Sequence, residues 1–175
     1  MKINNLFGIF IRYIILVLLA LGNLYLFYQI FTPLTIYPSL WVLKLFYNAY
    51  IQGNILTANN IQISLIQACI AGAAYYLLCI LNLTTPIPLK TRIKSLCFLL
   101  FSFLILNILR IVVFTTLFIN NYRYFNFTHE LFWYFGSTIL VLFIWFVNTM
   151  FFKIKEIPIY SDFKDIIKLL REKHK

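Results

Sequence analysis

The stretch SLCFLLFSFLILNILRIVVFTTLFI, residues 95–119, decides the class of this protein. It exceeds the roughly 20 apolar residues that a helix needs to cross a bilayer, and Arg110 is its only charged residue. The whole chain of 175 residues has the same character, since 62% is hydrophobic, 11% is charged and the mean hydropathy is +0.87. A water-soluble domain carries roughly 25% charged residues. We therefore exclude an ordinary cytosolic enzyme, a disordered chain and a small disulfide scaffold, and we expect an all-α integral membrane protein.

Three further stretches are long and apolar enough to cross a membrane. They run from Tyr13 to Phe31, from Leu65 to Leu83 and from Leu131 to Phe152. A fifth stretch, from Leu34 to Tyr50, is short and contains Pro38 and Lys44, so we expect it to be only partly embedded. The sequence thus predicts a helical bundle of four full spans and one partly embedded segment, with residues 1–152 forming a single transmembrane domain.

The basic residues indicate how this bundle is oriented. With four spans, twelve of the fifteen Lys and Arg residues fall on one side, namely Lys2, Arg12, the loop residues Lys90, Arg92 and Lys94, and seven residues of the tail. Cytoplasmic segments carry an excess of Lys and Arg, so we expect both termini to be cytoplasmic. Residues 153–175 predict a basic amphipathic tail on the inner membrane surface, because Phe163, Ile166, Ile167 and Leu170 follow helical spacing.

The outer region between the first two spans carries a strand-like pattern. Residues 61–65 alternate between apolar and polar side chains, which is the period of a β-strand. Asn59-Asn60 suits a two-residue turn after residues 55–58, and Gly53-Asn54 marks an earlier break. A small outer β-hairpin is one interpretation of this region, and an irregular polar loop is the other.

Arg110 is the most costly residue within the predicted spans. Placing an arginine near the centre of a bilayer costs about 2.5–3.5 kcal/mol on insertion scales. Two interpretations are open: the side chain extends to the outer head groups, or it faces inward as the cation of a polar site. Asn107 lies one turn earlier on the same helix face and would then hold the guanidinium.

Cys69 lies near the outer end of its predicted span, in the segment Ala68-Cys69-Ile70-Ala71-Gly72. A lone cysteine in an apolar helix is usually a small packing residue. Near a helix N-terminus, however, the helix dipole and a nearby arginine both favour the reactive thiolate. The small residues that follow, including Gly72, allow a substrate or another helix to approach closely. Cys79 and Cys97 lack this context and are interpreted as packing residues.

His129 begins the fourth predicted span, with Thr128 as its N-cap. The positive end of a helix favours a neutral imidazole, which can act as a general base; the alternative is a histidine that only caps the helix. The predicted topology places Cys69, Arg110 and His129 at the outer ends of three different spans, so we expect them to converge on one site. All five carboxylates lie outside the predicted spans, and the sequence contains no metal-ligand cluster and no phosphate-binding glycine motif.

These segments resemble the archaeosortase/exosortase family, which consists of multi-spanning cysteine enzymes, and the short chain is similar to its compact archaeal members. The likeness covers residues 34–150 and is carried by Ala68-Cys69-Ile70-Ala71-Gly72, by Asn107-Ile108-Leu109-Arg110-Ile111 and by His129. The cysteine segment is one residue longer than the family pattern. Gln67 stands where the family often has an acidic residue.

The resemblance implies a cysteine peptidase or transpeptidase that processes C-terminal sorting signals. Cys69 would be the nucleophile, His129 would transfer the proton and Arg110 would stabilise the negative charge, while we expect substrate contacts from Asn107 and Gly72. The implied partners are exported proteins that end in a motif, a transmembrane segment and a basic cluster, with a membrane lipid as acceptor and with no cofactor, metal or nucleic acid. The competing class is a non-enzymatic scaffold or transporter subunit, in which Arg110 binds an anion or a lipid head group.

Overall fold

The computed structural model describes residues 3–164 and residue 167, and most of this chain is helical. Its longest element is α5, Leu89–Ile119, which contains the predicted span 95–119 and begins earlier, directly after Pro88. A proline is tolerated at a helix start because the N–H that it lacks would have no helical partner there. The buried face of α5 recurs every three or four residues and consists of Arg92, Ser95, Leu99, Phe103, Asn107, Ile111 and Thr115.

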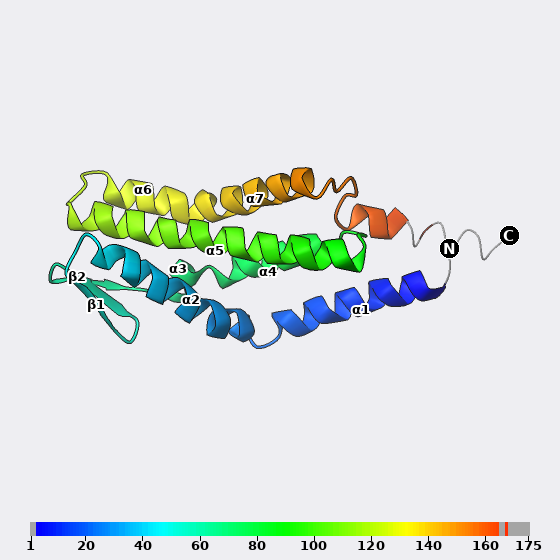
Figure 1. Cartoon of the computed structure of the whole chain (residues 1–175), viewed down its shortest axis with the longest axis horizontal. Helices are drawn as coiled ribbons and strands as arrows, with labels where there is room; N and C mark the ends of the chain where they lie inside the picture. Colours follow the sequence, from blue (N-terminus) through cyan, green and yellow to red (C-terminus); the bar gives the residue numbers. More distant parts are fainter. Residues whose placement is uncertain (1–2, 165–166, 168–175) are drawn as a thin grey trace.

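Three further helices pack against α5 (Figure 1), namely α2 (Tyr25–Lys44), α4 (Gly72–Leu83) and α7 (Ser137–Phe151). Aromatic side chains join them: Tyr75 of α4 stacks on Phe31 of α2 at 3.6 Å and meets the edge of Phe103 of α5 at 4.8 Å, both between ring centroids. The core of the bundle therefore lies where α2, α4 and α5 meet.

The predicted first span over residues 13–31 is not one continuous helix, because the structure divides it between two helices. α1, Ile3–Ala20, ends before Gly22, Asn23 and Leu24, which all adopt left-handed φ angles between 55° and 68°. Glycine and asparagine commonly end helices in this conformation. Hydropathy does not register the break, since the residues on both sides are apolar.

The stretch from Leu34 to Tyr50 is also different from its prediction. We expected it to be partly embedded, but most of it belongs to α2, which continues to Lys44 through Pro33 and Pro38. Helices in membranes tolerate internal prolines because neighbouring groups satisfy the freed backbone. Figure 1 shows α1 and α2 following one another along one side of the molecule.

Three helical segments of the described chain are long and apolar enough to cross a membrane, namely Tyr25–Lys44, Leu89–Ile119 and Phe125–Phe151. Phe7–Ala20 and Gln67–Leu83 are apolar but shorter. The helices expose large apolar side chains, as illustrated by Trp41 at 67% and Met150 at 79%. Extensive apolar surface of this kind marks a membrane contact, so the fold is that of a helical membrane protein.

The predicted β-hairpin with its turn at Asn59-Asn60 is confirmed, and it belongs to a three-stranded antiparallel sheet in the order β1-β2-β3. Its strands are β1 (Ala49–Gln52), β2 (Ile55–Ala58) and β3 (Ile61–Ser64). Asn59 and Asn60 have φ angles of 48° and 65°, as a two-residue hairpin turn requires. We did not predict β1, because its first residues fell in the stretch interpreted as embedded.

Two helix starts also differ from the prediction. The expected helix over residues 65–83 is interrupted at Ala71, whose φ is 59°, so that a single turn, α3 (Gln67–Ile70), precedes α4. The last helix starts at Phe125 as α6 (Phe125–Leu131), passes through the π-helical turn η1 (Phe132–Gly136) and continues as α7. A side chain on Gly136 would collide with the ring of Phe132, so this glycine leaves room for the ring within the π-helical turn.

The described part of the tail returns to the end of the bundle that lies opposite the sheet (Figure 1). The amide of Ile159 donates a hydrogen bond to the carbonyl of Thr84, and Asp162 pairs with Arg12 of α1 at 2.8 Å. Much of the predicted amphipathic helix of residues 153–175, including Ile166 and Leu170, lies outside the described residues.

Candidate functional site

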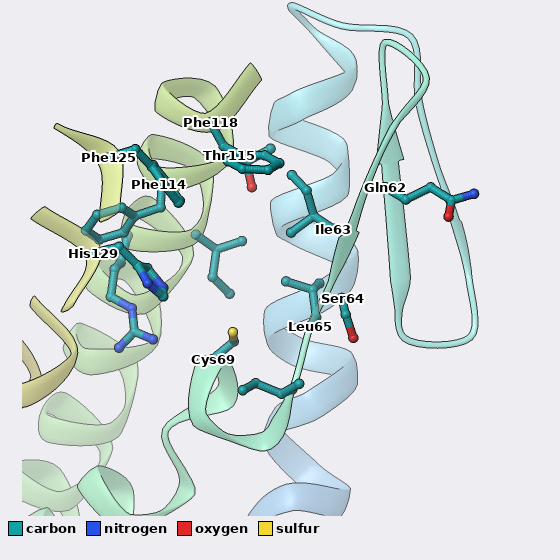
Figure 2. A pocket seen from close by; sticks show the side chains of 13 residues that line it. Gln62, Ile63, Ser64, Leu65, Cys69, Phe114, Thr115, Phe118, Phe125 and His129 are labelled. Carbon is teal, nitrogen blue, oxygen red and sulfur yellow. The ribbon is translucent and has the colours of Figure 1, made fainter. Parts of the chain in front are cut away.

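A pocket of about 310 Å³ opens beside the sheet, between β3, α3, α5 and α6 (Figure 2). Cys69, Arg110 and His129 all line it, although they come from three helices that are far apart in the sequence. Most of the remaining lining residues are apolar, so the thiol, the guanidinium and the imidazole share a largely hydrophobic pocket. The structure therefore brings together the three residues that the sequence analysis singled out.

Cys69 lies in the single turn of α3, where its half-buried thiol points into the pocket (Figure 2). Its own amide donates to the carbonyl of Ile66 at 2.9 Å, which closes the turn. The left-handed Ala71 then ends α3 immediately after Ile70. We expected Cys69 inside a continuous span, whereas the structure presents it on a short helix that is separate from α4.

Arg110 reaches across from α5 to the backbone of α3. One of its guanidinium nitrogens donates a hydrogen bond to the carbonyl of Ala68 at 3.2 Å. A guanidinium has five N–H donors, and this is its only hydrogen bond to protein within the described residues. The side chain is thus fixed beside Cys69, with donors still available to a molecule in the pocket.

Asn107 is 1% exposed and does not line the pocket. It lies behind the pocket and contacts the backbone of α3. Its amide nitrogen donates to the carbonyls of Cys69 at 3.0 Å and Ile70 at 3.2 Å. Since α3 is a single turn, its carbonyls have no further helical turn to bond. Asn107 therefore holds α3 in place; we expected it to hold Arg110 or to contact substrate.

Gly72, which we expected to contact substrate, is buried at the start of α4 and is not among the residues that line the pocket. A Cβ atom at this position would lie 2.8 Å from ring carbons of Tyr28 in α2. The glycine therefore allows α2 and α4 to approach closely, and the space that we assigned to substrate is filled by the tyrosine ring.

His129 lies in the middle of α6, so our assignment of Thr128 as the helix N-cap is wrong: the helix begins at Phe125 and Tyr124 precedes it. The imidazole stacks on the ring of Phe125 at 5.5 Å and meets the ring of Phe114 edge-on at 5.4 Å. Aromatic rings, and not a helix end, therefore fix the orientation of the histidine.

The aromatic and strand residues of the pocket were not among the predicted site residues. Phe114 and Thr115 follow Arg110 on α5, and Ile63 and Ser64 belong to β3. Thr115 could have been found, because it continues the buried α5 face at the spacing of Asn107. The β3 residues could not have been assigned to the site, since nothing in their local pattern shows which helix the strand approaches.

The chemistry of the pocket follows from its three polar groups. A thiol can act as a nucleophile, an imidazole can accept or donate a proton, and a guanidinium can stabilise a developing negative charge. Within the described residues, no group of three or more His, Cys, Asp and Glu side chains is arranged to hold a metal ion. The arrangement suits acyl transfer through a cysteine.

Comparisons with protein-family models, with curated proteins and with solved structures gave no match for this chain.

Proposed function

We propose that this protein is a membrane cysteine peptidase or transpeptidase of the archaeosortase/exosortase type. It would cleave the C-terminal sorting signal of exported proteins and transfer them to a lipid anchor at the cell surface. The observation that carries the proposal is the presence of Cys69, Arg110 and His129 on the wall of one pocket. The resemblance of the segments around these residues to that family supplies the reaction and the substrate class.

In this reaction the Cys69 thiolate attacks the carbonyl carbon of the scissile peptide bond, after its proton has passed to His129. The negative charge that develops on the carbonyl oxygen is stabilised by the free donors of Arg110. When the C–N bond breaks, His129 returns the proton to the leaving amine and the substrate remains as a thioester on the sulfur. The amine of a lipid then attacks the thioester, and the thiol is regenerated.

The same proposal includes an orientation in the membrane, with four crossings, both termini in the cytoplasm and the pocket at the outer face. α1 and α2 together would form the first crossing and α3 and α4 the second. With four crossings, twelve basic residues fall on one side of the membrane, and the excess of Lys and Arg in cytoplasmic segments supports the proposal that this side is the cytoplasm. A membrane-impermeant maleimide should label Cys69 from outside, and a reporter fused after Lys175 should read as cytoplasmic. Labelling from the inside alone would contradict the orientation.

The decisive experiment removes the thiol of Cys69. Candidate substrates are exported proteins of the same cell that end in a short motif, an apolar span and a basic cluster. With the wild-type protein, mass spectrometry should find a new C-terminus on such a substrate; Cys69→Ala should abolish it, whereas the matched variant Cys97→Ala, at an exposed cysteine of α5, should not. Normal processing by a well-expressed Cys69→Ala variant would instead favour a non-enzymatic scaffold or transporter subunit.

A further inference from the structure

β3 is an edge strand, and its free edge faces the pocket. The sheet order is β1-β2-β3, so among the residues that the structure describes β3 pairs with β2 on one side only. The pocket lining includes the consecutive residues 62–66, which cover most of β3 and the segment leading to α3. Figure 2 shows the strand that carries Ile63 standing between the pocket and the rest of the sheet.

The register of the sheet tells which backbone groups of β3 are free. The two-residue turn closes on the pair Ala58 and Ile61, and the amide of Leu65 donates to the carbonyl of Asn54 at 2.8 Å. Because alternate residues of an antiparallel strand bond to the same neighbour, residues 61, 63 and 65 bond toward β2. The amides and carbonyls of Gln62 and Ser64 therefore point to the free edge.

No other part of the described chain uses these groups. Among the hydrogen bonds outside the ladder, none within residues 3–164 involves the backbone of Gln62 or Ser64. An unpaired strand edge is a template for an extended peptide, which gains main-chain hydrogen bonds by adding a strand. The strand also leads directly to the nucleophile, since Cys69 follows Ser64 after the short segment 65–68.

We propose that the substrate binds by adding an extended segment to β3 as a fourth strand, an inference that rests on the proposed function. Since β3 has four residues and a strand rises roughly 3.3 Å per residue, about four substrate residues would pair with it. The paired segment carries the scissile carbonyl to Cys69 and Arg110. Recognition is then largely of the substrate backbone.

The walls of the pocket also indicate one side chain of the substrate. Alternate residues of the added strand project to the same face, and the pocket on that path is lined mainly by apolar groups. These are Ile63, Ile111, Phe114, Phe118 and Phe125. The substrate residue next to the scissile bond therefore carries an apolar side chain, and charged residues there are excluded.

The first test removes amides from the two free edges of the sheet. Ser64→Pro and Gln62→Pro each delete an N–H that faces the pocket, and an edge strand tolerates proline at such positions. Each should raise KM for a Cys69-dependent substrate about fivefold to tenfold, because one hydrogen bond is lost. The matched control is Ile51→Pro, whose amide faces the opposite edge on β1. Labelling of Cys69 by a small maleimide should stay unchanged in all three.

The second test leaves the protein intact and modifies the peptide. N-methylation of a synthetic substrate, one residue at a time, should weaken binding at every second position of the paired segment and have little effect between them. Equal sensitivity at all positions, or unchanged KM in both proline variants, would overturn strand addition. Oxidative cross-linking of two Ser64→Cys copies to each other would also overturn it, since the edge would then serve self-association.

The two proposals fail in different ways. If no exported protein is processed in a Cys69-dependent manner, the proposed function falls and strand addition falls with it. If processing depends on Cys69 but neither the proline variants nor the N-methylated peptides show the expected pattern, only strand addition falls.

Discussion

Two arginines of α5, one near its start and one in its second half, have very different partners. Arg92 is 8% exposed and its guanidinium donates to four carbonyls, those of Asn82, Leu83, Thr85 and Ile87, at 2.6–3.3 Å. Arg110 makes one hydrogen bond within the described part of the chain, to the carbonyl of Ala68. Both guanidinium groups have five donors, so that of Arg92 is almost fully used by the fold whereas most of the donors of Arg110 remain available.

We interpret Arg92 as a structural cation, whereas Arg110 has the free donors that the proposed function requires. The carbonyls around Arg92 come from the end of α4 and the loop after it, where a helix leaves its last carbonyls without helical partners. Arg92 supplies those partners inside the bundle. In the sequence analysis we grouped Arg92 with the cytoplasmic loop residues, and its burial was not expected, because the pattern of charges does not show where a side chain folds back.

The largest effect on stability is expected from substitution of Arg92. Arg92→Met removes four hydrogen bonds and leaves buried carbonyls without partners, so the free energy of unfolding should fall by about 4 kcal/mol or more. Thermal unfolding in detergent, followed by tryptophan fluorescence, measures it. Lys94→Met, at an exposed position two residues further along α5, is the control and should leave Tm near the wild-type value. A normal Tm for Arg92→Met would show that water can replace the guanidinium.

Under the proposed function, substitution of Arg110 should affect activity and leave stability nearly unchanged. Arg110→Met should reduce kcat/KM for substrate processing about 10²–10³-fold, because a donor to the developing negative charge is lost. Its Tm should change little, since one hydrogen bond to Ala68 is removed. Arg110→Lys keeps the positive charge but lacks the planar guanidinium and its several N–H donors, so it should recover part of the rate. A collapse of Tm in both variants would mean that Arg110 is structural, like Arg92.

The same contrast explains what was predictable from the sequence. Cys69, Arg110 and His129 stand out because polar groups are costly in apolar helices, and the structure places all three on one pocket. The break after Ala20 and the left-handed Ala71 were missed, because hydropathy averages over a window and does not register a local φ angle. Which strand, ring or carbonyl meets each side chain depends on contacts between distant segments, and a local pattern does not contain them.

An intermediate effect is expected at Asn107, whose substitution should affect both stability and activity. Asn107→Leu deletes the donors to the carbonyls of Cys69 and Ile70, so α3 loses its support. The free energy of unfolding should fall by about 1–3 kcal/mol. Because displacement of the nucleophile impairs the reaction, kcat should fall roughly tenfold to a hundredfold. Leu109→Ala, on the exposed side of α5, is the control. Loss of stability with an unchanged kcat would show that α3 keeps its position without Asn107.

The smallest effect is expected at Asp162. Its partner Arg12 donates to the carbonyl of Thr85, as Arg92 does. The carboxylate of Asp162 accepts a hydrogen bond from Arg12 at 2.8 Å, yet Arg12 also donates to the carbonyls of Leu83 and Thr85. Asp162→Asn keeps an acceptor beside Arg12 and leaves the guanidinium with its other partners, so the free energy of unfolding should fall by only about 1 kcal/mol. Substrate processing should be unaffected, because Asp162 pairs with Arg12 beside Leu83 at the end of α4, whereas the pocket lies at α3, which precedes the start of α4. Tm and kcat measured on the same preparation test both parts. If processing fell as far as in Arg110→Met, the two ends of the molecule would be coupled, and the division between structural and functional arginines would not hold.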